Sequence, residues 1–391
     1  MELDQLFTNN KEQTLYGRYI TNEHIEPLLD KYKEKFKVTV VGNSVLGKPI
    51  YNVVAGNGST RIFIWSQMHG NESTTTKAVV DFINWLAGDD TIANKFLNYF
   101  TFCIIPIANP DGAELYTREN ANNIDLNRDA LHLTQPESKI LRKAFEDFNP
   151  HYCYNMHDQR TIFGLETEGG AKPATVSFLA PAYNEDRDIN STRQQAINLI
   201  VAMNQALQEY IPRQVGRFDD SFNINCIGDS FQAAGVPTVL FEAGHYPGDY
   251  EREQTRKFIF FALLSGFNSI YENVLVGAKN KEYFNIPQNK KIFYDIVYKN
   301  VKINYENKEK IAIFASQYKE VLIDKSVIFQ AFISEIDNLK DYYWHEEYDG
   351  NGEWFVGKNN KSFPEKDDKA DFFIGPGRRF INGKEIKQEL I

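Results

Sequence analysis

Residues 61–72 constrain the fold of this 391-residue chain more than any other stretch. The stretch begins Arg-Ile-Phe-Ile-Trp, which is apolar and β-branched or aromatic, and residues 73–87 then carry apolar side chains at helical spacing. A buried strand therefore turns directly into a helix, with His69 and Glu72 at the turn. Ligands of an open α/β sheet bind beyond the carboxyl ends of its strands, so this turn is a candidate site.

The first 280 residues alternate strand-like and helix-like patterns. This alternation predicts an α/β domain over residues 1–280, with a mixed, mostly parallel sheet sandwiched by helices. The composition of residues 108–112 is that of a turn. The predicted helices are 1–36, 74–86, 136–148, 191–211 and 257–271, and the predicted strands are 36–41 and 50–54 (a hairpin), 61–67, 99–107, 151–156 and 236–241.

The character of the chain changes at residues 277–289, which are rich in Lys, Asn and Gln and are predicted to be a linker. Short apolar runs with turn-like separators follow it. They predict a small β-rich domain of unknown function over residues 290–391. The runs are 302–305, 311–315, 320–323 and 327–332.

Composition and charge exclude several classes of partner. The formal net charge of -10 repels nucleic acid and anionic lipid, and the sequence has no basic patch to offset it. No run reaches 18 consecutive apolar residues, which argues against a membrane span. The start lacks a secretory signal, and Cys103, Cys153 and Cys226 are predicted to be free thiols. A cytoplasmic location is the expectation, although a signal peptide removed earlier would leave the same sequence.

Four polar positions fall at or near the carboxyl ends of predicted buried strands: His69 with Glu72, the loop 116–129, His157 and Glu242. Two imidazoles and one carboxylate are the ligand set of a catalytic zinc ion, which lowers the pKa of bound water to about 7. A further carboxylate at the rim can take a proton from that water. Burial after an apolar strand is expected to raise the pKa of Glu242 toward this role.

Each of these residues also has a plainer interpretation. His69 and Glu72 alone are a weak signal, because a histidine at a helix start is often a cap or a surface residue. His157 alone is compatible with a core histidine, and Asn127-Arg128 with a surface turn. Asp158 is a candidate partner for the second nitrogen of a metal-bound histidine.

The motifs, taken together, resemble the zinc metallocarboxypeptidases of the carboxypeptidase A type. The resemblance spans residues 15–270, and both the order and the approximate separations of the motifs fit. It implies a carboxypeptidase-like fold and one zinc ion per chain. The motifs are His69-Gly70-Asn71-Glu72, Asn109-Pro110-Asp111-Gly112, Arg118 through Asn127-Arg128, His157 and Phe241-Glu242.

The resemblance also implies a role for each matching residue. The implied reaction is hydrolysis of a C-terminal peptide bond by metal-activated water, without a covalent acyl-enzyme. The substrate would be a peptide or acyl-amino acid with a free carboxylate. The roles are His69, Glu72 and His157 as zinc ligands, Arg118 polarising the scissile carbonyl, Asn127 and Arg128 holding the terminal carboxylate, and Glu242 as general base and then acid.

The sequence departs from the family at three places that bear on substrate choice, two of them being Asp158-Gln159-Arg160 after His157 and Ala243-Gly244-His245 after Glu242. A family-typical tyrosine closes over the substrate carboxylate, but Ser221-Phe222-Asn223 stands there, with Tyr246 and Tyr250 as candidate substitutes. Two alternatives therefore stay open: an acyl-amino acid deacylase or cell-wall peptide amidase of the same fold, and a catalytically weak binding protein. The side-chain preference and the oligomeric state are not determined by the sequence.

Overall fold

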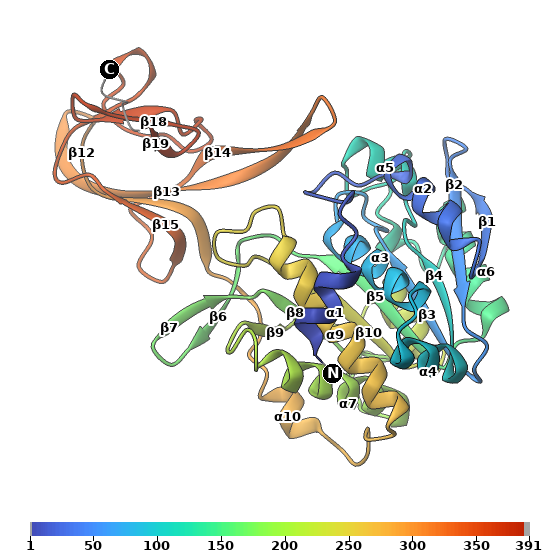
Figure 1. Cartoon of the computed structure of the whole chain (residues 1–391). Coiled ribbons are helices and arrows are strands. Elements are labelled where there is room, and N and C mark those ends of the chain that lie inside the picture. Colours follow the sequence, from blue (N-terminus) through green and yellow to red (C-terminus); the bar gives the residue numbers. More distant parts are fainter. Residues whose placement is uncertain (1, 387–391) are drawn as a thin grey trace. The chain divides into compact units, whose positions relative to one another are not determined.

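The computed structural model describes residues 2–386, and the chain divides into two compact units. Unit 1 comprises the residues up to Arg160 together with Leu165–Asn289. Unit 2 comprises Thr161–Gly164 and the described residues from Lys290 onward. Figure 1 shows the elements of both units. None of the described helices is both long and apolar enough to span a bilayer.

Unit 1 is built on an eight-stranded sheet in the order β1-β2-β4-β3-β5-β10-β8-β9. The four central strands β4, β3, β5 and β10 run parallel, whereas the β1-β2 hairpin, the β2-β4 pair and the β10-β8 pair are antiparallel. The predicted mixed sheet is confirmed. Its strands are β1 (Lys37–Asn43), β2 (Pro49–Ala55), β3 (Thr60–Ser66), β4 (Phe100–Ile105), β5 (Tyr152–Asp158), β8 (Val176–Leu179), β9 (Val215–Arg217) and β10 (Thr238–Ala243).

Helices connect and cover these strands (Figure 1). Two helix starts are capped by side chains that favour this position. Asp90 accepts from the amides of residues 92 and 93 at the start of α4, and Asn190 accepts from the amide of Arg193 at the start of α7. The helices are α1 (Leu3–Asn10), α2 (Asn22–Tyr32), α3 (Thr74–Ala87), α4 (Thr91–Tyr99), α5 (Pro110–Leu115), η1 (Leu126–Arg128), α6 (Pro136–Phe148), α7 (Ser191–Leu207), α8 (Ile227–Ala233), α9 (Glu253–Tyr271) and α10 (Asn280–Phe284).

Three local predictions are wrong. The predicted helix 1–36 is replaced by the two helices α1 and α2, because the segment between them buries Leu15, whose carbonyl accepts from the Arg256 guanidinium instead of a helical amide. The predicted turn 108–112 starts α5, since Asn109 and Pro110 are also the residues of a helix N-terminus. The predicted linker contains α10, whose Tyr283 is buried and accepts a hydrogen bond from the Ala180 amide within unit 1.

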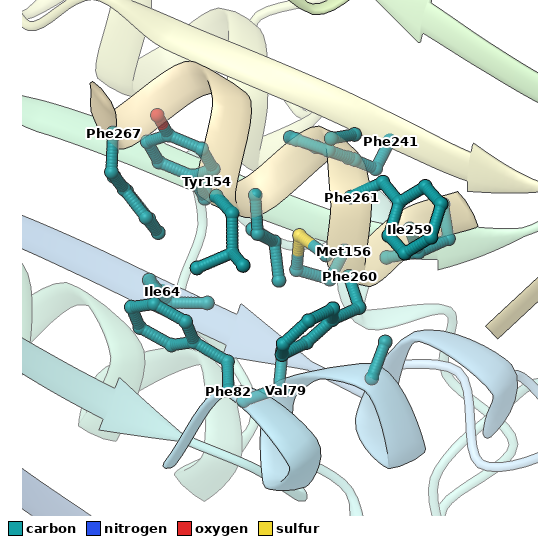
Figure 2. Packing of buried hydrophobic residues seen from close by; sticks show 14 of the residues in the cluster. Ile64, Val79, Phe82, Tyr154, Met156, Phe241, Ile259, Phe260, Phe261 and Phe267 are labelled. Carbon is teal, nitrogen blue, oxygen red and sulfur yellow. The ribbon is translucent and has the colours of Figure 1, made fainter. Parts of the chain in front are cut away.

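The main core of unit 1 lies on the sheet face covered by α3, α7 and α9. Figure 2 shows Tyr154 and Met156 of β5 and Phe241 of β10 packed among aromatic side chains of α3 and α9. Because side chains alternate along a strand, residues 155, 157 and 242 point to the opposite face. That face carries a smaller core around Phe63, Trp65 and Phe231.

Unit 2 is β-rich, with two four-stranded sheets in the orders β14-β13-β12-β15 and β16-β17-β18-β19. Its strands are longer than the sequence predicts: runs 311–315 and 320–323 belong to one strand, because the polar residues between them continue its pairing. Its strands are β12 (Phe293–Tyr305), β13 (Lys308–Ile323), β14 (Ser326–Ile336), β15 (Tyr343–Asp349), β16 (Phe355–Val356), β17 (Phe372–Ile374), β18 (Arg378–Ile381) and β19 (Lys384–Ile386), with η2 (Lys358–Asn360).

Three short strands complete the described chain: β6 (Phe163–Thr167), β7 (Gly170–Pro173) and β11 (Lys290–Lys291). β11 pairs with the first two residues of β6, Phe163 and Gly164. The buried side chains of unit 2 form their own cluster, in which Tyr298 packs between Phe314 and Phe372. Unit 2 therefore has a hydrophobic core independent of the sheet described above.

Candidate metal centre and active site

Three potential metal donors meet beyond the carboxyl ends of β3 and β5, which are parallel neighbours. His69 and Glu72 follow β3, and His157 is the second-last residue of β5. The Nδ1 atoms of the two histidines lie 3.1 Å apart, and each is 2.8 Å from one carboxylate oxygen of Glu72. All three donor atoms lie within 4.8 Å of one another, so the group could hold one metal ion.

The electrostatics of the cluster follow from its burial. Burial opposes the ionisation of Glu72, but the imidazoles of His69 and His157 hold the pKa of its carboxyl well below its usual range. Burial lowers the pKa of His157, whereas for His69 the neighbouring Glu72 and Asp125 outweigh burial and raise the pKa. Metal binding requires an ionised carboxylate and two neutral imidazoles, so an ion would compete with the proton that Glu72 and Asp125 favour on His69.

The residues present fit a zinc ion. Two ring nitrogens and one carboxylate are a common three-ligand set of catalytic zinc, and here all three are buried and directed at one another. The second nitrogen of His69, Nε2, lies 3.0 Å from Oδ1 of Asp125, a contact that fixes the ring orientation. Nε2 of His157 is buried and has no hydrogen-bond partner among the described residues.

Asp125 and Asp158 correct the expectation for the histidine partner. The side chain of Asp158 does not orient a histidine: it accepts from the amides of Thr74 and Thr75 and so caps the start of α3. Its backbone amide donates to Glu72, 3.1 Å away. Asp125 takes the predicted role instead, and its only sequence signal is its place two residues before Asn127, whose amide it also accepts.

Glu242 lies beside His157, because β10 and β5 are parallel and these two residues are in register. It is the fifth residue of β10 and does not follow the strand as predicted. Its Oε2 is buried and, within residues 2–386, accepts no hydrogen bond. Burial, with the charges of Glu72 and Asp158, raises the pKa of Glu242 well above its ordinary value. Such a carboxyl can hold and release a proton near the donor cluster.

Two arginines of the loop 116–129 reach this region in different ways. Arg118 contacts Glu72 (Nη1 to Oε1, 3.2 Å) and Asp125 (Nε to Oδ2, 3.1 Å), and 40% of its side chain is exposed. Arg128 donates to the Asn127 carbonyl and to the sulfur of Cys226, 3.2 Å away, but makes no ion pair with any described carboxylate. Its guanidinium can therefore take an external carboxylate.

Asn127 ties this loop to the start of α8. Its side-chain oxygen accepts from the amide of Ile227 at 2.9 Å. The structure thus brings all seven predicted site residues to one end of the central strands, and hydrogen bonds to Asp125 connect His69, Arg118 and Asn127. Of the two candidate tyrosines, Tyr250 packs on His245, and Tyr246 packs on Phe258 of α9.

A cluster of two histidines and a glutamate at the end of a parallel sheet, with a buried carboxyl beside it, is the arrangement of a metallohydrolase. Residues 21–205 match the model of the zinc carboxypeptidase family. This match confirms the resemblance predicted from the motifs, and it covers the strands β3 and β5 that carry the three donors.

Two similar proteins and one solved structure agree with the match. Carboxypeptidase 2 of Trichophyton rubrum is 31% identical over 107 residues, which are 27% of this chain and 20% of that protein. Gamma-D-glutamyl-L-diamino acid endopeptidase 1 of Lysinibacillus sphaericus is 38% identical over 85 residues, 20% of this chain and 22% of that protein. A metallo-carboxypeptidase from Burkholderia cenocepacia has the same fold, with a TM-score of 0.51, 18% identity and coverage of 64% of this chain and 70% of its own.

The curated relatives match this chain over only part of their length. The matched segments span about a fifth of the two curated relatives, so their whole activities do not transfer to this chain directly. At 18% identity, the similarity to the solved structure supports an inference about the fold alone.

Proposed function

We propose that the chain hydrolyses the C-terminal peptide bond of a peptide, with one zinc ion held by His69, Glu72 and His157. The convergence of the two Nδ1 atoms and the Glu72 carboxylate within 4.8 Å carries this proposal. When bound, zinc supplies Lewis acidity and an acidified water at that point. The match of residues 21–205 to the zinc carboxypeptidases supports the choice of metal and of reaction.

Glu242 would move the proton. Its carboxyl lies next to His157 across the β5-β10 pair, and burial raises its pKa, so it can accept a proton from the attacking water and return it to the leaving amine. Water attacks the carbonyl carbon, the C–N bond breaks, and the new amine takes the proton. Arg118, a half-exposed cation beside Glu72, would stabilise the negative charge that develops on the carbonyl oxygen.

Arg128, with Asn127, would hold the terminal carboxylate of the substrate. The guanidinium forms no ion pair in the described chain, and a bidentate carboxylate would satisfy it. Arg128→Ala should raise KM about tenfold to a hundredfold for substrates with a free carboxylate, because a charge-assisted hydrogen bond contributes ~1.5–3 kcal/mol. Equal damage on amidated substrates would refute this role.

The similarity to a γ-D-glutamyl-L-diamino acid endopeptidase favours a second candidate, hydrolysis of a cell-wall type peptide by the same residues. Hydrolysis of an acyl-amino acid is a third reaction compatible with the free-carboxylate anchor. Each of these reactions needs the same metal ligands and the same Glu242. Substrates therefore separate them, and mutations of the metal site do not.

The test combines metal analysis with a screen for release of a terminal residue. Purified chain should contain one zinc ion, and His69→Ala should lose it, measured by plasma mass spectrometry. Zinc-loaded chain is then offered blocked dipeptides, acyl-amino acids and γ-D-glutamyl-L-diamino acid peptides. Stoichiometric zinc in His69→Ala would refute the ligand assignment, and zinc binding without turnover of any amide would support a binding protein instead.

A further inference from the structure

Asn155 is a buried amide on the site face of β5 with both polar atoms unsatisfied. The residue is 1% exposed, and neither Oδ1 nor Nδ2 has a hydrogen-bond partner within the described residues. A buried unsatisfied donor or acceptor costs ~1–3 kcal/mol, so such a group in a native core needs a reason. A ligand that reaches it would remove the cost.

The position of Asn155 relates it to the reacting groups. It precedes His157 by two residues on the same strand, so both side chains point to the same sheet face. Its register partners are Trp65 on β3 and Leu240 on β10, and Leu240 precedes Glu242 by two residues. Asn155 therefore lies two residues before His157 along β5, between the aromatic Trp65 on β3 and the aliphatic Leu240 on β10.

The start of α8 connects Asn155 to the arginine that would anchor the substrate. Asn127, next to Arg128, accepts from the amide of Ile227. The following residue, Gly228, faces the amide: a Cβ atom added there would lie 3.5 Å from Nδ2 of Asn155. The same Cβ would lie 3.3 Å from Cγ of Pro181, so the start of α8 passes close to the amide, and a larger residue at position 228 would crowd it.

A terminal residue bound at this site has two groups already placed. Its carboxylate would lie at Arg128 and its scissile carbonyl near His69 and His157, so its side chain must point away from both. The start of α8, Leu240 and Asn155 border one region that such a side chain could enter.

We propose that the Asn155 amide is a specificity-determining group that binds the polar end of the substrate's terminal side chain. The apolar walls of Trp65 and Leu240 suit a carbon stem, and an amide that both donates and accepts suits a carboxamide or hydroxyl end. The substrate class is a peptide ending in a residue such as glutamine or asparagine. The inference rests on the proposed carboxypeptidase function and narrows it.

The test compares matched substrate pairs on the zinc-loaded full chain. Blocked dipeptides ending in Gln and Met, or in Asn and Leu, have similar shape and differ in the carboxamide. The chain should prefer the carboxamide partner of at least one pair by more than about tenfold in kcat/KM, because a site built to hydrogen-bond rejects an analogue that lacks the group. Asn155→Leu, of similar volume, should bring the ratio within about threefold of unity.

Two further variants keep the outcome clear. Cys153→Ala changes the same face of β5 two residues earlier and should leave the preference unchanged. If Asn155→Leu reduces turnover of every dipeptide, affinity is measured in the Glu242→Gln background, where the carboxamide dipeptide should bind more than about tenfold tighter and Asn155→Leu should remove the difference.

The possible failures are distinguishable. A chain that cleaves the dipeptides without a carboxamide preference, or an Asn155→Leu chain that keeps the preference, overturns the role of Asn155 and leaves the carboxypeptidase function standing. A zinc-loaded chain that cleaves none of the dipeptides overturns the carboxypeptidase function, and the inference about Asn155 with it.

Discussion

The two faces of strands β5 and β10 differ sharply although they share one backbone. One face presents Tyr154, Met156 and Phe241 to α3 and α9, where they pack mainly among apolar and aromatic side chains (Figure 2). The other face presents Asn155, His157 and Glu242, three buried or half-buried polar groups with unsatisfied atoms. Burial of the first face stabilises the fold, whereas the polar groups of the second face cost stability unless a metal, ligand or water partners them.

The comparison teaches how a rigid site is built. Alternation along a strand lets a fully packed core and a polar cluster lie one residue apart, so the core fixes the backbone that positions the ligands. The same separation predicts that changes on the apolar face should affect mainly stability, and that changes on the polar face should affect mainly metal binding and turnover.

Glu242→Gln, on the face that carries the donor cluster, should have the largest effect on turnover. We expect kcat to fall by about 10²–10⁴-fold, because a proton carrier is lost. Zinc content should stay near one per chain, and the free energy of unfolding should not fall, since a neutral amide replaces a carboxyl that burial already disfavours in its charged form. Steady-state kinetics, metal analysis and urea unfolding check the three parts; a parallel loss of zinc would contradict the separation.

Phe241→Ala, one residue earlier on the apolar face, should instead lower stability and leave zinc binding and turnover largely intact. We expect the free energy of unfolding to fall by about 3–5 kcal/mol, because a fully buried ring in the main core leaves a cavity. The folded fraction should still bind zinc and retain kcat within about tenfold. Urea unfolding, with kinetics below the transition, tests this; loss of zinc at full folding would show that the two faces are coupled.

Asp125→Asn probes the support of the site face from outside the sheet. Its carboxylate lies 3.0 Å from Nε2 of His69, and partners of metal-bound histidines contribute about 10–100-fold to metal affinity. We expect zinc affinity to fall within that range while stability changes little. Competition with a fluorescent zinc chelator measures the effect, and Asp158→Asn is the matched control, because that side chain caps α3 and contacts neither imidazole.

Met156→Leu should have the smallest effect. The swap nearly conserves volume on the apolar face, so a change below about 1.5 kcal/mol in the free energy of unfolding is expected. The kinetics should not change, although His157 is the next residue. A kcat reduced by more than about tenfold would show that small repacking behind β5 reaches the ligands.

Local patterns in the sequence predicted much of the fold. The strand at 60–66, the helix at 74–87 and the β1-β2 hairpin agree with their apolar periodicity and Gly-containing turns. The segment between α1 and α2 and the helix α10 did not follow their local composition, because contacts with Arg256 and Ala180 decide their conformations.

Part of the site was also readable in advance. The motifs supplied the seven candidate residues in order, and all seven lie at one end of the parallel strands. Asp125 and Asn155 were missed, because an aspartate in a polar loop and an asparagine in an apolar strand carry no signal by type alone. Their positions in the fold indicate their roles instead: Asp125, for example, contacts His69, which is 56 residues away in the sequence.

The sequence by itself determined which residues share a strand face and where strands become helices, because these depend on periods of two and 3.6 residues. Only the tertiary structure decided that β5 lies between β3 and β10. That order sets His157 beside Glu72, 85 residues away, and beside Glu242 in register. It also decided which carboxyls are buried, and hence that the pKa of Glu72 is lowered while that of Glu242 is raised.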